Sequence, residues 1–247
     1  MRAIIAVPFF DTPENGRSGA TRRTFATLRG QIEPPHQIVA VDNGSTDKSA
    51  YHDVSELADT LVVLDEPHSI AYGVNFAWHL YEDAIMRGEA VAVKHDSDLN
   101  VVQSDWLDVL LSLASEHSDL ALVGPKHSRI EYGKNWVLKD HDTWFESPFV
   151  HGGVAMRTPK GFETIGYAWQ PYGRWGWQDH FDCKRIRQFT ALKIGIVKGL
   201  QFEQHIGHSA LSREDKEEIR AKGNENLFAE LDRIKSADRP VFQEFTP

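Results

Sequence analysis

The segment AVAVKHDSDLNV, residues 90–101, joins an apolar run directly to two acidic side chains. Ala90–Val93 is typical of a strand that is buried on both faces, and Asp96-Ser97-Asp98 follows almost at once. Two carboxylates placed two residues apart repel each other and are costly to bury without a cationic partner. The strand therefore either ends in solvent, where Asp and Ser are ordinary turn residues, or leads into a cation site.

Apolar runs of the same kind recur along the first half of the chain and alternate with helical patterns. Strands are predicted at residues 3–7, 37–41, 61–64, 90–93 and 120–123, and helices at 20–29, 47–57, 74–87 and from 105 onward. Pro8 is expected to end the first strand, Gly30 to end the first helix and Ser104 to cap the helix that starts at Asp105. This alternation predicts an α/β fold, a Rossmann-like α/β/α sandwich with a mostly parallel central sheet.

The second half of the chain is less regular. A helix is predicted at residues 179–187, a strand at 192–197 and a polar helix at about 212–235. No repeat or clean linker divides the chain, so one domain is expected over residues 1–247. Its parts would be a regular first half (1–124), an irregular second half (125–211) and a C-terminal helical tail (212–247).

Acidic side chains follow three of the predicted strands, at the point where each strand ends. Asp11 follows the first strand, Asp42 the second, and Asp96 and Asp98 the fourth. Ligands of such sheets bind beyond the carboxyl ends of the strands, so these side chains should lie along one rim. That convergence favours the cation site over the solvent turn.

Composition narrows the class of protein. The chain of 247 residues has 41% hydrophobic and 26% charged residues, as globular proteins do, and a formal net charge of −9 disfavours a nucleic-acid partner. A single cysteine, Cys183, excludes an internal disulfide. The apolar start lacks the form of a signal peptide, and no segment reaches the ~20 apolar residues that span a bilayer. We therefore expect a cytoplasmic protein with no membrane span.

The carboxylates suggest a definite chemistry. Carboxylate oxygens suit Mg²⁺ or Mn²⁺, which keep coordination positions open for phosphate. Asp42 leaves a buried strand at the ligand rim and could accept hydrogen bonds from a nucleobase or a ribose hydroxyl. The alternative for VDNGSTD, residues 41–47, is a simple turn built around Asn43-Gly44.

Five segments together resemble the ordered motifs of family 2 glycosyltransferases with the GT-A fold. They are AVPFF (6–10), VDNGSTD (41–47), IAYGVNFAW (70–78), HDSDLNV (95–101) and GWQDHFDCKRI (176–186). The resemblance covers about residues 3–210 in the order and spacing of the family. It implies a GT-A-like fold and transfer of a sugar from a UDP- or GDP-sugar to a saccharide or another hydroxyl acceptor. It also implies that residues 1–124 form the nucleotide-sugar-binding half and residues 125–211 the acceptor-binding and catalytic half.

The resemblance also implies roles for single residues. The donor nucleotide and its sugar would meet the following positions: Pro8 and Phe9 in the pocket wall, Asp42 at the base, Gly73 and Asn75 shaping the pocket, and Asp96 near the ribose or sugar. Asp98 would hold Mn²⁺ or Mg²⁺ against the diphosphate, and Asp179 would be the general base of an inverting transfer. Cys183 and Arg185 match the same helix but are expected to be a packing residue and a surface charge.

Histidine and aromatic residues complete the predicted site. His205 matches a family position that completes the metal shell in some members, with His208 as the alternative; His151 and His180 are further candidates, and a structural role is open for each. An acceptor platform is expected from aromatic residues before Asp179, with Trp175, Trp177 and Gln178 as its members and Trp169 and Tyr172 nearby. Gln178 replaces the usual Glu, and His95 replaces an apolar residue.

Two other functions are compatible with the sequence. A sugar-nucleotide nucleotidyltransferase uses a related sheet, but it needs a Gly-rich, basic loop after the first strand, which PFFDTPENGRSG (8–19) matches poorly. A non-catalytic nucleotide- or sugar-binding protein would not need Asp42, Asp96, Asp98 and Asp179 together. Hydrolysis of a nucleotide sugar would distinguish these possibilities.

Overall fold

The computed structural model describes residues 1–31, 35–128, 130–170, 178–204 and 245–247. The strands are β1 (Arg2–Phe9), β2 (His36–Asn43), β3 (Thr60–Leu64), β4 (Ala90–His95), β5 (Leu99–Val101), β6 (Leu120–His127), β7 (Lys139–Asp140), β8 (Trp144–Glu146), β9 (Val154–Arg157) and β10 (Lys193–Gln204). The helices are α1 (Ser18–Gln31), α2 (Tyr51–Leu57), α3 (Ile70–His79), α4 (Glu82–Met86), α5 (Trp106–Glu116), α6 (Pro159–Ile165) and α7 (Gln178–Phe189).

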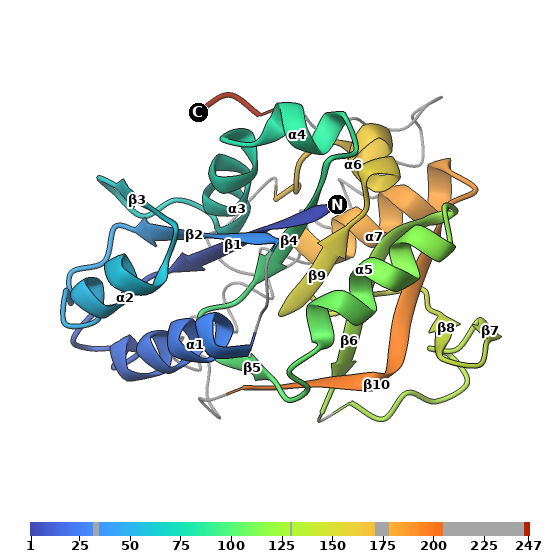
Figure 1. Cartoon of the computed structure of the whole chain (residues 1–247), viewed down its shortest axis with the longest axis horizontal. Coiled ribbons are helices and arrows are strands. Elements are labelled where there is room, and N and C mark those ends of the chain that lie inside the picture. The colour runs from blue at the N-terminus through green and yellow to red at the C-terminus, as the bar shows by residue number, and fades with distance from the viewer. Residues whose placement is uncertain (32–34, 129, 171–177, 205–244) are drawn as a thin grey trace, which may run out of the picture.

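The strands form one central sheet in the order β3-β2-β1-β4-β9-β6-β10-β8-β7, and β5 pairs with β10 (Figure 1). The pairs β1–β2, β1–β4, β2–β3 and β6–β10 are parallel. β9 lies between β4 and β6 and is antiparallel to both. The predicted mostly parallel α/β sheet is therefore confirmed, with one reversed strand at its centre.

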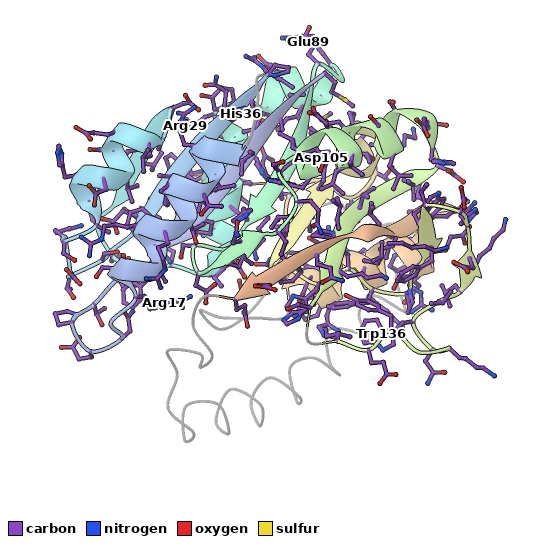
Figure 2. The ribbon with its side chains drawn as sticks, turned by 60° about the horizontal axis from the view of Figure 1, so that its bottom comes forward. Arg17, Arg29, His36, Glu89, Asp105 and Trp136 are labelled. Carbon is purple, nitrogen blue, oxygen red and sulfur yellow. The ribbon has the colours of Figure 1, made fainter. Side chains whose placement is uncertain are left out.

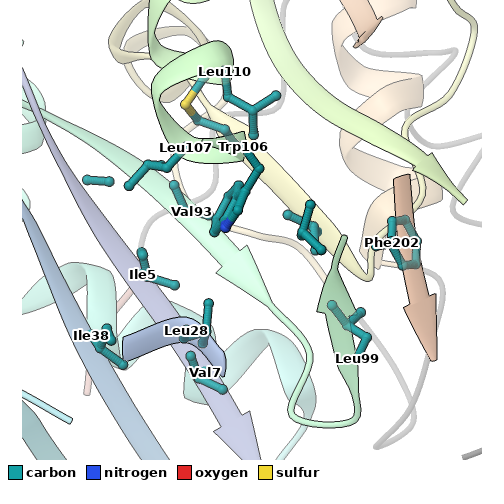
Figure 3. Packing of buried hydrophobic residues seen from close by; sticks show 14 of the residues in the cluster. Ile5, Val7, Leu28, Ile38, Val93, Leu99, Trp106, Leu107, Leu110 and Phe202 are labelled. Carbon is teal, nitrogen blue, oxygen red and sulfur yellow. The ribbon is translucent and has the colours of Figure 1, made fainter. Parts of the chain in front are cut away.

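Alternate residues of the central strands feed two hydrophobic layers. Ile5 and Val7 of β1 pack with Phe25 and Leu28 of α1 and with Trp106 of α5 (Figure 3). On the opposite face, side chains of the same strands pack against α3, α4 and α6. A strand buried on both faces reads as a continuous apolar run, which is why β1, β2 and β4 were recognisable in the sequence.

Pro8 does not end the first strand: β1 continues to Phe9 and pairs there with β2. The pairing of β1 with β4 ends at Ala6 and Lys94, so the end of β1 is bounded on one side only. A proline is tolerated in a strand at such an edge.

Three predicted helix boundaries were wrong. α1 runs through Gly30 to Gln31, and α2 begins at Tyr51 instead of Asp47. Ser104 does not cap α5; its N-cap is Asp105, which makes no side-chain capping bond.

The predicted helix at 74–87 was also wrong as a single element, because it is divided into α3 and α4 with a break at Leu80 and Tyr81. Both pieces bury residues in the same layer, so the apolar pattern continues across the break.

The polar helix expected at 212–235 lies outside the described residues. None of the helices in the described ranges is long and apolar enough to cross a membrane.

Candidate functional site

The acidic side chains at the carboxyl ends of β1, β2 and β4 lie at one rim of the sheet, as predicted. Figure 2 shows His36 and Glu89, which lie at the starts of β2 and β4, at one edge of the molecule and Arg17 at the other. Hydrogen bonds connect the loops of this rim: the Asp11 N–H donates to Ser45 Oγ (2.8 Å), and the Asp11 carbonyl accepts from Thr46 and Asp47.

Asp42, the next-to-last residue of β2, is a fully buried carboxylate with two partners. Its Oδ1 accepts from the Ser45 N–H (2.8 Å), and its Oδ2 pairs with Lys48 Nζ. The turn depends on Gly44, whose φ is +75° and whose missing Cβ would lie 2.8 Å from the backbone at Glu66. Asn-Gly thus forms a turn that also holds Asp42 at the rim, so the two interpretations of VDNGSTD are compatible.

Asp11 is buried at the rim, where within the described ranges it bonds to a hydroxyl and to no cation. Its Oδ1 accepts from Thr21 Oγ1 (3.0 Å), and its Oδ2 meets no hydrogen-bond donor of the described part of the chain. Burial raises the pKa of Asp11 to about 6, the Thr21 bond and Arg17 oppose the rise, and the charges of Asp47 and Asp42 add to it.

The two carboxylates of DSD are each paired with a cation of the chain. Lys94 Nζ lies 2.5 Å from Asp96 Oδ1, and Arg17 Nη2 lies 2.6 Å from Asp98 Oδ2. Burial raises the pKa of Asp98, the Arg17 guanidinium opposes the rise, and the Asp96 charge adds to it. The cost of burying two like charges is therefore met here by internal ion pairs.

A hard divalent ion fits the chemistry of this pair of carboxylates. The Asp98 side chain is 11% exposed and already attracts a cation, so a metal ion would take the position of the Arg17 guanidinium. The described ranges contain no group of three His, Cys, Asp or Glu side chains that could hold a metal. His205 and His208, the predicted additional ligands, lie outside the described residues.

The predicted pocket-shaping residues occupy different positions. Gly73 of α3 lies over β1, where an added Cβ would meet the Pro8 side chain at 3.4 Å, an ordinary van der Waals contact. Phe9 is buried, and the centre of its ring lies 6.1 Å from the centre of the Phe25 ring. Asn75 exchanges two hydrogen bonds of 2.9 Å with the backbone of Ala168, which links α3 to the second half of the chain.

Asp179 lies in the first turn of α7 and is bonded to the segment that precedes β9. Its Oδ2 accepts from the Gly152 N–H (3.0 Å), and its Oδ1 accepts from the His180 N–H (2.9 Å). Lys94 Nζ donates to the Gly152 carbonyl. The predicted base and the predicted donor carboxylate Asp96 therefore belong to one hydrogen-bonded unit.

A small cavity adjoins this unit and is lined by Lys94, Gly152, Gln178 and Asp179, among others. The centre of a water molecule can move within about 20 Å³ of this cavity, which is enough space to hold one water. Gln178, predicted at the acceptor platform, is buried, and its Oε1 has no hydrogen-bond partner among the residues that the structure describes.

A buried ion triad fixes α7 below Asp179. Asp182 pairs with Arg157 of β9 and, at 2.5 Å, with Arg185. Arg185 is fully buried and also donates to the carbonyls of Ile165 and Tyr167, so its prediction as a surface charge was wrong. Cys183 is buried, as its predicted packing role requires, and burial raises the pKa of its thiol.

The remaining predicted side chains show mainly packing contacts. His95 is buried, and the centre of its ring lies 6.0 Å from the centre of the Trp106 ring. Its Nδ1 lies 2.8 Å from the Asp96 carbonyl oxygen. Burial lowers the pKa of His151, while the charges of Asp179 and Asp96 oppose that change. Trp169 lies under the Arg185 guanidinium. Three predicted aromatic residues lie outside the described residues: Tyr172, Trp175 and Trp177.

Several solved structures have a fold similar to that of this chain, at low sequence identity. No protein-family model and no curated protein sequence matches it. The solved structures that resemble it include GalNAc-T7 with UDP, GalNAc and Mn²⁺ (TM-score 0.62, 13% identity), with 86% of this chain and 45% of that chain covered. Another is S. aureus TarS 1–349 in complex with UDP-GlcNAc (TM-score 0.58, 15% identity), with 96% of this chain and 71% of that chain covered. The fold is that of GT-A glycosyltransferases. This chain spans less than half the length of the GalNAc-T7 chain.

Four residues of the site were not recognised in the sequence: Arg17, Lys94, Gly152 and Gly153. Lys94 gave a signal, since a lysine inside a strand buried on both faces needs a carboxylate partner. The glycine pair gave a weaker one, because Gly-Gly only indicates a close backbone approach. Arg17 lies in a loop and gave no signal.

Proposed function

We propose that the protein is an inverting glycosyltransferase that transfers a sugar from a UDP- or GDP-sugar to a hydroxyl of an acceptor. The observation that carries the proposal is the position of Asp42, Asp96 and Asp98 at one rim, with Asp179 joined to Asp96 through Lys94 and the Gly152 peptide. The GT-A fold and the UDP and UDP-GlcNAc present in structures of similar fold support this choice of donor.

In this proposal the donor lies across the carboxyl ends of β1, β2 and β4. Asp42 is directed to the base and Asp96 to the ribose or the sugar. Pro8 and Gly73 form the pocket wall where α3 meets the strands, and Phe9 supports it from the α1 side of the sheet. Asn75 contributes indirectly, because its amide bonds hold Ala168 against α3.

Asp98, with Asp96 beside it, would hold Mn²⁺ or Mg²⁺, and the bound ion would neutralise charge on the leaving diphosphate. The Mn²⁺ in the GalNAc-T7 structure supports this dependence. Arg17 would leave Asp98 when the ion binds, and its guanidinium would then be available to a phosphate oxygen.

Asp179 acts as the general base. The N–H groups of Gly152 and His180 donate to its two oxygens and so orient the carboxylate. The carboxylate accepts the proton of the acceptor hydroxyl as that oxygen attacks the anomeric carbon from the face opposite the diphosphate. The bond to the diphosphate breaks in the same step, which inverts the configuration.

The test is release of nucleotide from UDP-glucose, UDP-GlcNAc, UDP-GalNAc and GDP-mannose, with Mn²⁺, Mg²⁺ or EDTA, followed by NMR of the anomeric product. Asp179→Asn should lower turnover of the accepted donor about 10²- to 10⁴-fold without changing its dissociation constant. The exposed Asp108→Asn serves as the matched control. Unchanged turnover in Asp179→Asn would refute the base assignment, and a wild-type protein that binds donors without any turnover would favour the non-catalytic alternative.

A further inference from the structure

Lys94 is a buried lysine in the central strand β4, and its position is costly. Only 6% of its side chain is exposed, and its neighbours in the sheet are Ala6 of β1 and Ala155 of β9. A buried ammonium group is strongly destabilising unless it is paired and hydrogen-bonded. The partners that offset this cost belong to two different parts of the proposed site.

The first partner is the donor side of the rim. Lys94 Nζ lies 2.5 Å from Asp96 Oδ1, on the turn that follows β4, and the Asp96 side chain is 28% exposed. A charge-assisted bond of this kind fixes the direction of one carboxylate oxygen and leaves the residue accessible from the rim.

The second partner is the segment that carries the base. Lys94 Nζ also donates to the Gly152 carbonyl, and the Gly152 N–H donates to Asp179 Oδ2. The Asp96 N–H donates in parallel to the Gly153 carbonyl (2.8 Å). One peptide segment is therefore held from β4 on one side and holds Asp179 on the other.

The two glycines of this segment leave no room for a side chain. A Cβ on Gly152 would lie 2.9 Å from Asp179 Oδ2, and a Cβ on Gly153 would lie 2.8 Å from the Leu99 side chain. Real Cβ contacts are essentially never so short, so the close approach of Gly152 to Asp179 depends on the missing Cβ. The distance between the Gly152 peptide and Asp179 is thus set by direct contact of the Gly152 backbone with the Asp179 side chain.

We infer that Lys94 is a positioning residue that sets the spacing between Asp96 and Asp179 through the peptide of Gly152. The inference rests on the proposed function and deepens it, since it connects the donor carboxylate to the base. Lys94 bonds Asp96 directly and reaches Asp179 only through the Gly152 peptide. Its ammonium group fixes both by one shared set of hydrogen bonds.

The first experiment needs no substrate. Lys94→Met keeps the apolar stem and removes the ammonium group, so the Gly152 amide should exchange with solvent about tenfold faster or more than in the wild type, as measured by NMR hydrogen exchange. The control is Lys193→Met, which removes ion pairs with Asp119 and Glu146 at the start of β10. Unchanged exchange at Gly152 in Lys94→Met would overturn the inference.

The second experiment uses nucleotide release from the donor that the wild type accepts, together with calorimetric titration of that donor. Lys94→Met should lower kcat about 100-fold and weaken donor binding, because both Asp179 and Asp96 lose their orientation. Gly152→Ala should lower kcat to a similar extent and leave the donor dissociation constant unchanged, because it displaces only Asp179.

A purely structural role for Lys94 would lower the melting temperature in both lysine variants alike and leave kcat and donor affinity of the folded protein unchanged. That outcome would overturn the inference. If the wild type releases nucleotide from no donor, the proposed function fails, and the exchange rate of the Gly152 amide still decides whether the tether exists.

Discussion

Asp11 should make the stability of the protein depend on pH in a defined window. Its side chain is 1% exposed, and burial raises its pKa from 3.8 to about 6. The folded protein therefore holds a proton on this carboxyl at pH values where the unfolded chain has lost it. The contribution of Asp11 is fully present below pH 3.8 and is lost as the pH rises through about 6.

The size of the effect follows from the two pKa values. The difference between 3.8 and about 6 is roughly two, and each unit corresponds to about 1.4 kcal/mol, so ionised Asp11 lowers the free energy of unfolding by up to about 3 kcal/mol near neutral pH. Asp11→Asn removes the charge and keeps an oxygen that can accept from Thr21. Relative to the wild type, the free energy of unfolding of the variant should rise by about 2 kcal/mol or more between pH 4 and pH 7.

The assay is urea unfolding followed by tryptophan fluorescence at pH steps between about 4 and 7. The decisive quantity is how the difference in free energy of unfolding between Asp11→Asn and wild type changes with pH. The absolute difference is less informative, because an asparagine amide at this buried site adds a cost of its own that does not depend on pH. The exposed Asp142→Asn is the matched control and should show no such change. If the free energies of unfolding of Asp11→Asn and wild type differ by the same amount at every pH in this range, the reasoning is refuted.

Two further substitutions test the ion pairs. Asp182→Ala leaves the buried Arg157 and Arg185 without their shared carboxylate, so urea unfolding should show a loss of about 3–5 kcal/mol, and a loss below about 1 kcal/mol would contradict the triad. Arg17→Ala frees Asp98 from its internal cation, so Mn²⁺ should bind about fivefold more tightly by EPR titration, the factor for a pair worth about 1 kcal/mol; equal affinity in variant and wild type would show that Arg17 does not compete with the ion.

The sheet was predictable because its central strands are buried on both faces. β1, β2 and β4 read as uninterrupted apolar runs, and the acidic residues after them marked the rim. The short strands β7 and β8 carry no comparable pattern, since they have only two and three residues. The break between α3 and α4 was missed because both helices contribute to the same apolar layer, so the periodic pattern continues.

The candidate site was predictable in its carboxylates and hidden in their partners. Asp42 lies at the end of β2, and Asp96 and Asp98 lie in the turn after β4, so local sequence places them at the rim. Arg17 meets Asp98 only because the loop before α1 folds back over the turn after β4. Arg185 was taken for a surface charge because its carboxylate partner Asp182, three residues away, is buried with it only through the packing of α7 on β9.

The reversed strand β9 bears on the order in which the protein can be made. It pairs with β4 and β6, both of which leave the ribosome earlier, and it is completed only at Arg157. Until then the inner edge of β4 carries unpaired peptide groups, which invite association with other chains. A chain stopped at residue 124 would keep that edge permanently open. β4, β6 and the strand β9 between them must therefore mature together, as one unit of biosynthesis.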